Sequence, residues 1–206
     1  MEYLEPFHED DLVVIISELL VATADSSDPL LDESVSQLLH AMRLRMEMDV
    51  VFVSEFVDGQ RMFRYVDATP GAAPGVEAGN SNPAEESVCQ RVVEGRVPEL
   101  VTDLSAMPAD QLPELPFRIG AHLSTPIVLT DKRVYGTLCC FSKAPRPELV
   151  QGDLDKLRLC ATLVARKVEL SEARGIKEPP PDWRLEPMDR YESPAWRESP
   201  RRAAGR

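Results

Sequence analysis

The sequence lacks several features that would place it in a large functional class. It has no apolar run near the roughly 20 residues needed to cross a bilayer, and residues 1–5 carry none of the basic residues that begin a secretory signal. Its 23 basic residues are outnumbered by 35 acidic ones, so the formal net charge is -12. Nucleic acid and anionic membrane surfaces repel such a chain, because both attract clustered lysine and arginine. We therefore expect a cytoplasmic protein that binds neither nucleic acid nor membranes.

Cysteine is also scarce, and its spacing excludes two further classes. The four cysteines are Cys89, Cys139, Cys140 and Cys160, and none forms a CxxC pair. Zinc ribbons and thioredoxin-like proteins need that pair, so neither is expected. Cys139 and Cys140 are neighbours that point to opposite faces of a predicted strand and cannot join without distortion. We interpret all four as free, buried thiols in a reducing compartment.

Apolar residues recur at helical spacing in three segments. Hydrophobic residues make up 43% of the 206 residues, enough for one domain with a real core and extensions. The spacing predicts a helix over residues 10–24 that is so apolar that it needs two neighbours or a partner chain. Residues 28–46 form an amphipathic helix that packs on a sheet, and residues 149–170 form a closing helix.

Strand-like segments occur as two hairpins. Residues 50–56 and 61–67 are rich in β-branched and aromatic side chains, and Asp58-Gly59 between them suits a turn that needs positive φ at both positions. A second hairpin joins residues 120–127 to residues 133–141. A helix followed by antiparallel hairpins indicates an α+β fold and not parallel βαβ units.

The segment between the two hairpins is largely irregular. Residues 68–81 form a long loop rich in glycine, alanine and proline, and such loops are often functional or mobile. A short helix follows at residues 84–94, with Asn82 as its predicted N-cap and Pro83 at its first position. Residues 103–118 form a second irregular stretch.

After Gly175 the composition changes to prolines among alternating charges. Such a tail buries too little apolar surface to offset its ordering entropy, which predicts disorder. It contains both tryptophans, Trp183 and Trp196. Tryptophan is enriched at protein interfaces, so a linear docking motif is one interpretation and incidental composition is the other.

This order of elements resembles that of the GAF domain family. Two stretches carry the resemblance, residues 84–98 and the hairpin at residues 122–141, and it extends over roughly residues 28–170. It implies an α+β fold in which long helices cover one face of an antiparallel sheet, while loops and a short helix roof a small-molecule pocket on the other. It also implies dimerisation through terminal helices. The expected organisation is an N-terminal helix extension at 1–27 that could serve as a dimer helix, a GAF domain at 28–171 and a Pro-rich disordered tail at 172–206.

The chain departs from the better-defined branches of that family. It has no Asn-Lys-x-Asp signature of cyclic-nucleotide binding, and no cysteine stands beside a histidine as bilin attachment requires. GAF enzymes that reduce free methionine sulfoxide use cysteines between the two hairpins, where this chain has only Cys89. The ligand or cofactor therefore stays unknown.

Candidate site residues follow from the expected pocket. His122 and Ser124 share one side of a strand near the loops, and Cys89 is a redox candidate whose alternative role is packing. No acid is placed to orient a Ser-His pair, so no catalytic residue is predicted. No second histidine or carboxylate stands at ligand spacing from His122, so no metal site is predicted. The residues expected to contact a ligand are His122, Ser124, Tyr65, Arg91, Arg118 and Glu86.

The function expected from these observations is sensory or regulatory, without catalysis. A small molecule would bind in the pocket of a homodimer, and the signal would pass to a partner protein through the tail or the terminal helices. Two alternatives remain open. One is a scaffold whose pocket is filled by its own side chains such as Phe52, Tyr65 or Phe141, and the other is a redox sensor or enzyme that uses Cys89.

Overall fold

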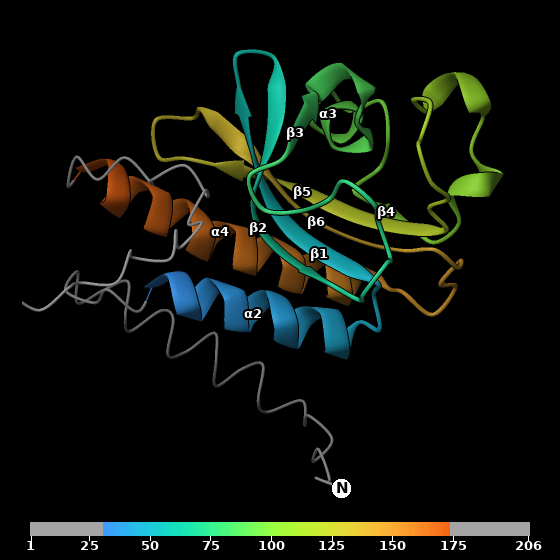
Figure 1. Cartoon of the computed structure of the whole chain (residues 1–206), viewed down its shortest axis with the longest axis horizontal. Helices are drawn as coiled ribbons and strands as arrows, with labels where there is room; N and C mark the ends of the chain where they lie inside the picture. Colours follow the sequence, from blue (N-terminus) through green and yellow to red (C-terminus); the bar gives the residue numbers. More distant parts are fainter. Residues whose placement is uncertain (1–30, 174–206) are drawn as a thin grey trace, which may run out of the picture.

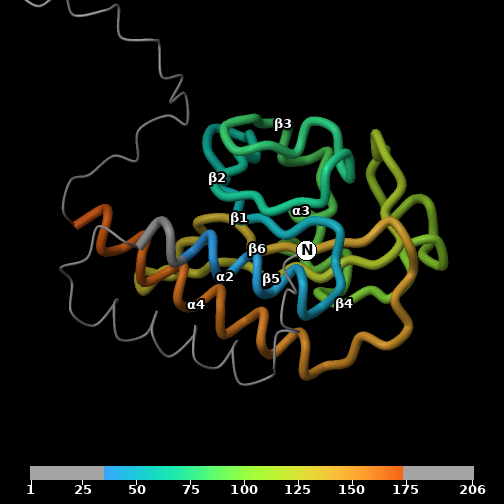
Figure 2. The backbone as a smooth tube through the Cα atoms, turned by 60° about the horizontal axis from the view of Figure 1, so that its bottom comes forward, coloured from blue at the N-terminus to red at the C-terminus, as the bar shows by residue number. Residues whose placement is uncertain are grey.

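The computed structural model describes residues 31–173, which form three layers. Helices α2 (Leu31–Arg45) and α4 (Gln151–Ala173) cover one face of a six-stranded sheet (Figure 1). Short elements and loops cover the other face. Figure 2 shows the same layers from another side, with α4 below the sheet and β3 above it.

All neighbouring strands in the sheet are antiparallel, and the strand order is β3-β2-β1-β6-β5-β4. The two long hairpins, β1–β2 and β5–β6, meet at the central β1–β6 pair, which confirms the predicted α+β fold. The strands are β1 (Val50–Val57), β2 (Gln60–Ala68), β3 (Ser81–Pro83), β4 (Leu100–Val101), β5 (Ala121–Val128) and β6 (Val134–Ser142). The short helices are α3 (Val88–Val93), η1 (Ala84–Glu86), η2 (Leu104–Ala106) and η3 (Ala109–Gln111).

The helix-covered face holds the main apolar core. The predicted inward faces of both long helices are buried, as Leu38 and Met42 show on α2 and Leu157 and Val164 on α4. They pack against Val51 and other strand residues of the same cluster. None of the helices in residues 31–173 combines the length and apolar composition that a bilayer crossing requires.

The first hairpin turns as its sequence predicts. Asp58 and Gly59 have φ values of 50° and 75°, so both positions adopt the left-handed conformation that favours Asp-Gly. The turn aligns β1 with β2 from Val57–Gln60 onward. Local turn chemistry therefore sets the start of this register.

A β-bulge on β2 then reverses the alternation of its side chains. Ser54 pairs with Phe63 and Val53 pairs with Tyr65, so Arg64 is left over. Phe63 packs on the open face of the sheet, whereas Tyr65 packs against the helix-side core. The expectation that Tyr65 contacts a ligand is thus corrected, because the extra residue turns it toward α4.

The short helix also differs from its prediction. Its N-cap is Ser87, whose Oγ accepts a hydrogen bond from the backbone N–H of Gln90 at 3.1 Å. Asn82 instead lies in β3, where its side chain accepts from Arg61. The predicted extension at 1–27 lies outside the described residues, and so does the predicted tail except for residues 172–173, which continue α4.

Candidate ligand pocket

A cavity of about 240 Å³ lies between the open face of the sheet and its roof. Phe52, Cys139 and Phe141 from the central strands form its floor. Residues 74–76, 86–89 and 115–117 close it from above and from the sides. The sheet supplies fixed positions and the roof consists of loops and a one-turn helix, an arrangement typical of small-molecule sites.

Aromatic side chains form most of the apolar wall. The rings of Phe52 and Phe63 meet edge to face with centroids 5.0 Å apart, and Phe117 stacks on Phe141 at 5.6 Å. These contacts hold the rings against one another. Phe52 and Phe141 therefore line the cavity and do not fill it.

Arg61 brings a positive charge to this apolar wall. Its guanidinium lies over the rings of Phe63 and Phe52, with its central carbon 4.8 and 5.5 Å from their centroids. Its Nε donates to Asn82 Oδ1 at 3.1 Å, and its Nη1 donates to Cys89 Sγ at 3.3 Å. No carboxylate between residues 31 and 173 forms an ion pair with it. The charge therefore lies at the cavity wall, where the Cys89 sulfur is its neighbour and an anionic group could share it.

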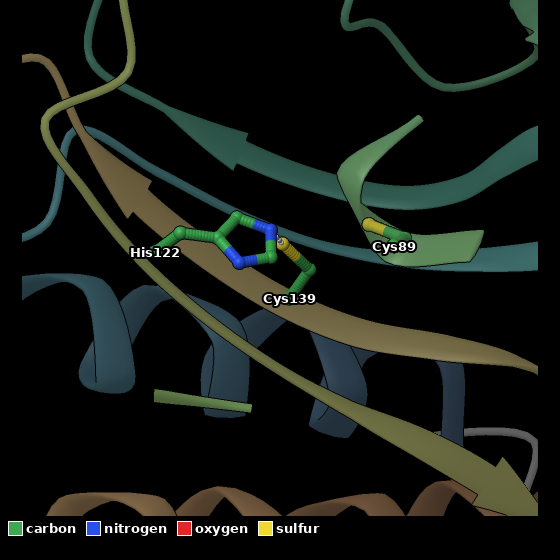
Figure 3. A group of neighbouring side chains, drawn as sticks. All are labelled: Cys89, His122 and Cys139. Carbon is green, nitrogen blue, oxygen red and sulfur yellow. Dashed lines mark hydrogen bonds between the residues drawn. The ribbon is translucent and has the colours of Figure 1, made fainter. Parts of the chain in front are cut away.

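Three further polar side chains meet at one end of the cavity (Figure 3). Cys89 comes from α3, His122 from β5 and Cys139 from β6, and all three line the cavity. His122 Nε2 lies 3.1 Å from Cys139 Sγ. One potential ligand atom from each of the three residues lies within 4.8 Å of the other two, and all three side chains are buried.

The two sulfurs of this group differ in their tendency to ionise. The hydrogen bond from Cys139 lowers the pKa of Cys89 well below its usual value, and the charge of Arg61 acts in the same direction against burial. Burial raises the pKa of Cys139 well above its usual value, and Cys89 raises it further. The arrangement therefore favours one thiolate, at Cys89, beside one thiol.

His122 has an unpaired polar atom. Its Nδ1 is buried and has no hydrogen-bond partner among the described residues. A buried polar group without a partner costs about 1–3 kcal/mol. A bound molecule or an ordered water in the cavity would remove that cost.

The structure brings together only some of the residues predicted from the sequence. His122, Glu86 and Cys89 line the cavity. Ser124 is fully buried on the same strand as His122, but it does not line the cavity, and its Oγ has no partner in the described part of the chain. Tyr65 lies on the opposite face of the sheet, as described above.

The two predicted arginines lie outside the cavity. Arg91 lines a shallower hollow beside it, together with Arg96 and Glu114, and its Nη1 donates to the carbonyl of Asp110 at 3.4 Å. Arg118 is exposed. Arg91 lies on the short helix α3 and Arg118 on irregular backbone, so strand parity could not place either of them.

Arg61 and Cys139 are two cavity residues that sequence reasoning missed. Arg61 lies just after the hairpin turn, two residues before Phe63 and ahead of the bulge. Alternation along the strand therefore places Arg61 on the same face of the sheet as Phe63, which could have been predicted from the sequence. Cys139 was interpreted as a packing residue because nothing along the chain places it near His122. Only the β5–β6 register, in which Ser124 pairs with Cys139, brings the two together.

The fold and the cavity together define a small sensor-type domain, an antiparallel sheet that holds a ligand pocket on one face. A family model described as GAF domain matches residues 30–169. The chain belongs to the GAF domain family. GAF domains are generally sensory or regulatory domains that bind small molecules.

Solved structures with the same fold come from proteins of different activity. The GAF domain of an Acinetobacter phosphoenolpyruvate-protein phosphotransferase has a TM-score of 0.62 at 15% identity, over 82% of this chain and 95% of that one. The phycocyanobilin-bound GAF domain of a cyanobacterial phytochrome has a TM-score of 0.59 at 14% identity, over 79% of this chain and 96% of that one. Free methionine-R-sulfoxide reductase from Neisseria meningitidis, solved with its substrate, has a TM-score of 0.59 at 16% identity, over 84% of this chain and 99% of that one. At these identities the similarity establishes the fold alone. No curated protein matches the sequence.

Proposed function

We propose that this protein is a cytoplasmic, non-catalytic GAF sensor that binds a small molecule in the cavity beside Arg61 and His122 and signals through protein–protein contact. The observation that carries the proposal is the cavity itself. Its aromatic walls pack against one another and still leave about 240 Å³ between sheet and roof. A scaffold with a self-filled pocket would have closed that space.

The size and charge of the cavity limit the ligand. Pockets for drug-sized molecules span roughly 300–1,000 Å³, so this one suits a smaller metabolite. Arg61 favours an anionic group, and Nδ1 of His122 needs a hydrogen-bond partner. A small anion with an apolar body meets both requirements.

The signal would leave through the helix-covered face. Leu44 on α2 and Leu159 on α4 are exposed at 40% and 44%, although both helices are otherwise packed on the sheet. An exposed apolar side chain on each helix is compatible with a homodimer or with a partner protein. Ligand binding would shift these helices through the strands that form the cavity floor.

A cysteine-based redox sensor is the second candidate, and the closeness of Cys89 and Cys139 favours it. Their sulfurs lie within 4.8 Å of each other. Both side chains are buried, however, whereas redox-sensing thiols are solvent-accessible. We therefore place this function after ligand sensing.

Native mass spectrometry of the protein purified from its own host tests the first proposal. We expect a dimer mass that carries a non-covalent small molecule, which is released on denaturation. Val76→Phe fills the roof of the cavity and should abolish the bound mass. Val128→Phe adds the same volume at a position that is 45% exposed and should retain it.

Two results would overturn the proposal. One is a wild-type protein that carries no small molecule and binds none from a host metabolite extract. The other is an adduct that survives denaturation, which would indicate a covalent cofactor.

A further inference from the structure

We propose that Cys89, His122 and Cys139 form a binding site for a thiophilic divalent cation such as Zn²⁺, with a coordination position open to the cavity. The inference goes beyond the sensing role, because metal binding can be measured without knowing the small molecule. It also differs from the expectation drawn from sequence spacing, which considered only ligands near His122 along the chain.

The geometry of the three side chains fits a tetrahedral ion. With Zn–S near 2.3 Å and Zn–N near 2.05 Å, the ligand atoms of such an ion lie about 3.5–3.8 Å apart. Here Nε2 of His122 is 3.1 Å from Sγ of Cys139, and the three ligand atoms lie within 4.8 Å of one another. Opening the first pair by about 0.5 Å and drawing Cys89 in by up to about 1 Å would bring the three ligand atoms to these separations.

The donor set selects the kind of metal. Two sulfurs and one imidazole nitrogen suit Zn²⁺ and similar thiophilic ions, whereas Mg²⁺ and Ca²⁺ prefer oxygen ligands. No carboxylate belongs to this group among the described residues. A hard cation is therefore not the expected occupant.

The surroundings hold the three ligands in place. They come from a helix and two strands, and each is at most 1% exposed. Arg61 on β2 donates to Cys89 Sγ at 3.3 Å, which restrains that sulfur. Ligands fixed by packing and by hydrogen bonds of this kind bind metal more tightly than mobile ones.

Charge balance indicates what the open position would accept. A Zn²⁺ ion with two thiolates is neutral, and binding releases to solvent any proton that the two sulfurs still carry. The nearby Arg61 adds one positive charge, while Glu86 elsewhere on the cavity wall is the negative group. Three protein ligands leave one position of a tetrahedron facing the cavity, where a small anion or water would bind.

Cobalt titration of the full chain tests the site. The protein is reduced with a phosphine, freed of metal with a chelator and titrated with Co²⁺, which gives thiolate charge-transfer absorption in a tetrahedral sulfur site. We expect one Co²⁺ per chain, displaced by one Zn²⁺. Cys89→Ser and Cys139→Ser should each weaken binding at least tenfold, and His122→Gln should change the visible bands.

Cys140→Ala is the matched control, because Cys140 is the next residue on β6 and faces the helices. It should bind Co²⁺ as the wild type does. Far-UV circular dichroism of each variant shows that it is folded. The wild-type spectrum needs no substitution, so the test does not depend on the variants.

Three outcomes would overturn the site. They are a wild type without thiolate–cobalt absorption, equal weakening by Cys140→Ala and Cys139→Ser, and a Cys89–Cys139 disulfide whose reduced form binds no metal. A retained small molecule without any cobalt signal would refute the metal site and leave the sensing proposal standing. Cobalt binding in a protein that carries no small molecule would support the metal site and refute the sensing proposal.

Discussion

The two faces of the sheet are built from the same strands but hold different chemistry. The helix side is a continuous and mainly aliphatic core, whereas the cavity side combines aromatic rings with Arg61 and His122. The cysteines divide evenly, with Cys140 and Cys160 on the helix side and Cys89 and Cys139 at the cavity. The difference indicates that one face supplies stability while the other retains groups whose burial is unfavourable until something binds.

The largest effect is expected at the sheet centre, which both faces share. A Cβ at Gly136 would lie 1.8 Å from the carbonyl oxygen of Ser54 on β1. Backbone atoms cannot move aside cheaply, so Gly136→Ala should lower the free energy of unfolding by more than about 4 kcal/mol or prevent folding. Urea unfolding followed by circular dichroism measures it.

Gly152→Ala is the control for that substitution. Its Cβ would meet nothing closer than a side-chain carbon of Val150 at 4.0 Å, and the position is the second residue of α4. Alanine there should stabilise the protein by about 0.5–1 kcal/mol. If Gly136→Ala behaved like this control, β1 and β6 would not be paired as described.

Truncation of one leucine on each side compares the faces directly. Leu157→Ala removes a fully buried side chain from the helix-side core and should cost about 2–5 kcal/mol. Leu115 is half-buried at an existing cavity, so Leu115→Ala should cost less than about 1.5 kcal/mol. Thermal and urea unfolding of both variants test the difference. Equal losses would mean that the cavity side is as tightly packed as the helix side.

Thiol labelling compares the two pairs of cysteines. Burial raises the pKa of Cys160 to about 12 and that of Cys140 far above its usual range, whereas the pKa of Cys89 is lowered. Thiolates are the reactive species, and Cys89 lines the cavity whereas Cys140 and Cys160 lie in the helix-side core. In metal-free, reduced protein at pH 8, iodoacetamide should modify Cys89 at least about 100-fold faster than Cys140 or Cys160.

Peptide mass mapping over time gives those rates, and urea should make all four cysteines react alike. Zn²⁺ should protect Cys89 if the metal site exists. Rapid native-state labelling of Cys160 would contradict its burial under α4.

The fold could be predicted from the sequence because its signals are local. The Asp58-Gly59 turn, the β-branched strand at Val50 and the helical spacing of Leu38 and Met42 each specify an element within a few residues. Once two hairpins and two long helices are assigned, few ways of burying their apolar faces remain. Resemblance to a known family then selected among them.

The site could be predicted only in part, because its geometry is set by pairing and not by spacing. His122 was found through strand parity, which holds along β5. The same reasoning misplaced Tyr65, since the bulge at Arg64 has no clear signature in the sequence. Cys89 and Cys139 reach His122 through α3 and the β5–β6 register, which no local pattern encodes.

Tyr65→Phe measures the consequence of that bulge. The Tyr65 hydroxyl accepts a hydrogen bond from Nζ of Lys167, a buried lysine of α4 whose ammonium also lies 4.3 Å from the ring centroid. Phenylalanine keeps the ring contact and loses the hydrogen bond, so we expect a loss of about 1 kcal/mol in urea unfolding. Binding in the cavity should be unchanged. If Tyr65→Phe weakened ligand or metal binding, Tyr65 would have to contact the pocket, against its described position.

The smallest change in stability is expected for His122→Leu in metal-free protein, and its sign is informative. The unpaired buried Nδ1 destabilises the wild type by about 1–3 kcal/mol, and leucine removes that penalty. Leucine also removes the stabilising contact between His122 and Cys139. The two effects nearly cancel, so the free energy of unfolding in chelator should stay within about 1 kcal/mol of the wild type.

Adding Zn²⁺ should then separate the two proteins. A ligand present at 100 times its dissociation constant stabilises the folded state by about 2.7 kcal/mol, and only the wild type would gain it. The comparison therefore distinguishes a histidine kept for binding from one kept for packing. The opposite result would be a variant that is much less stable than the wild type in chelator, with a stability difference that does not grow when Zn²⁺ is added. His122 would then be a structural residue, and the cavity face would be a second core.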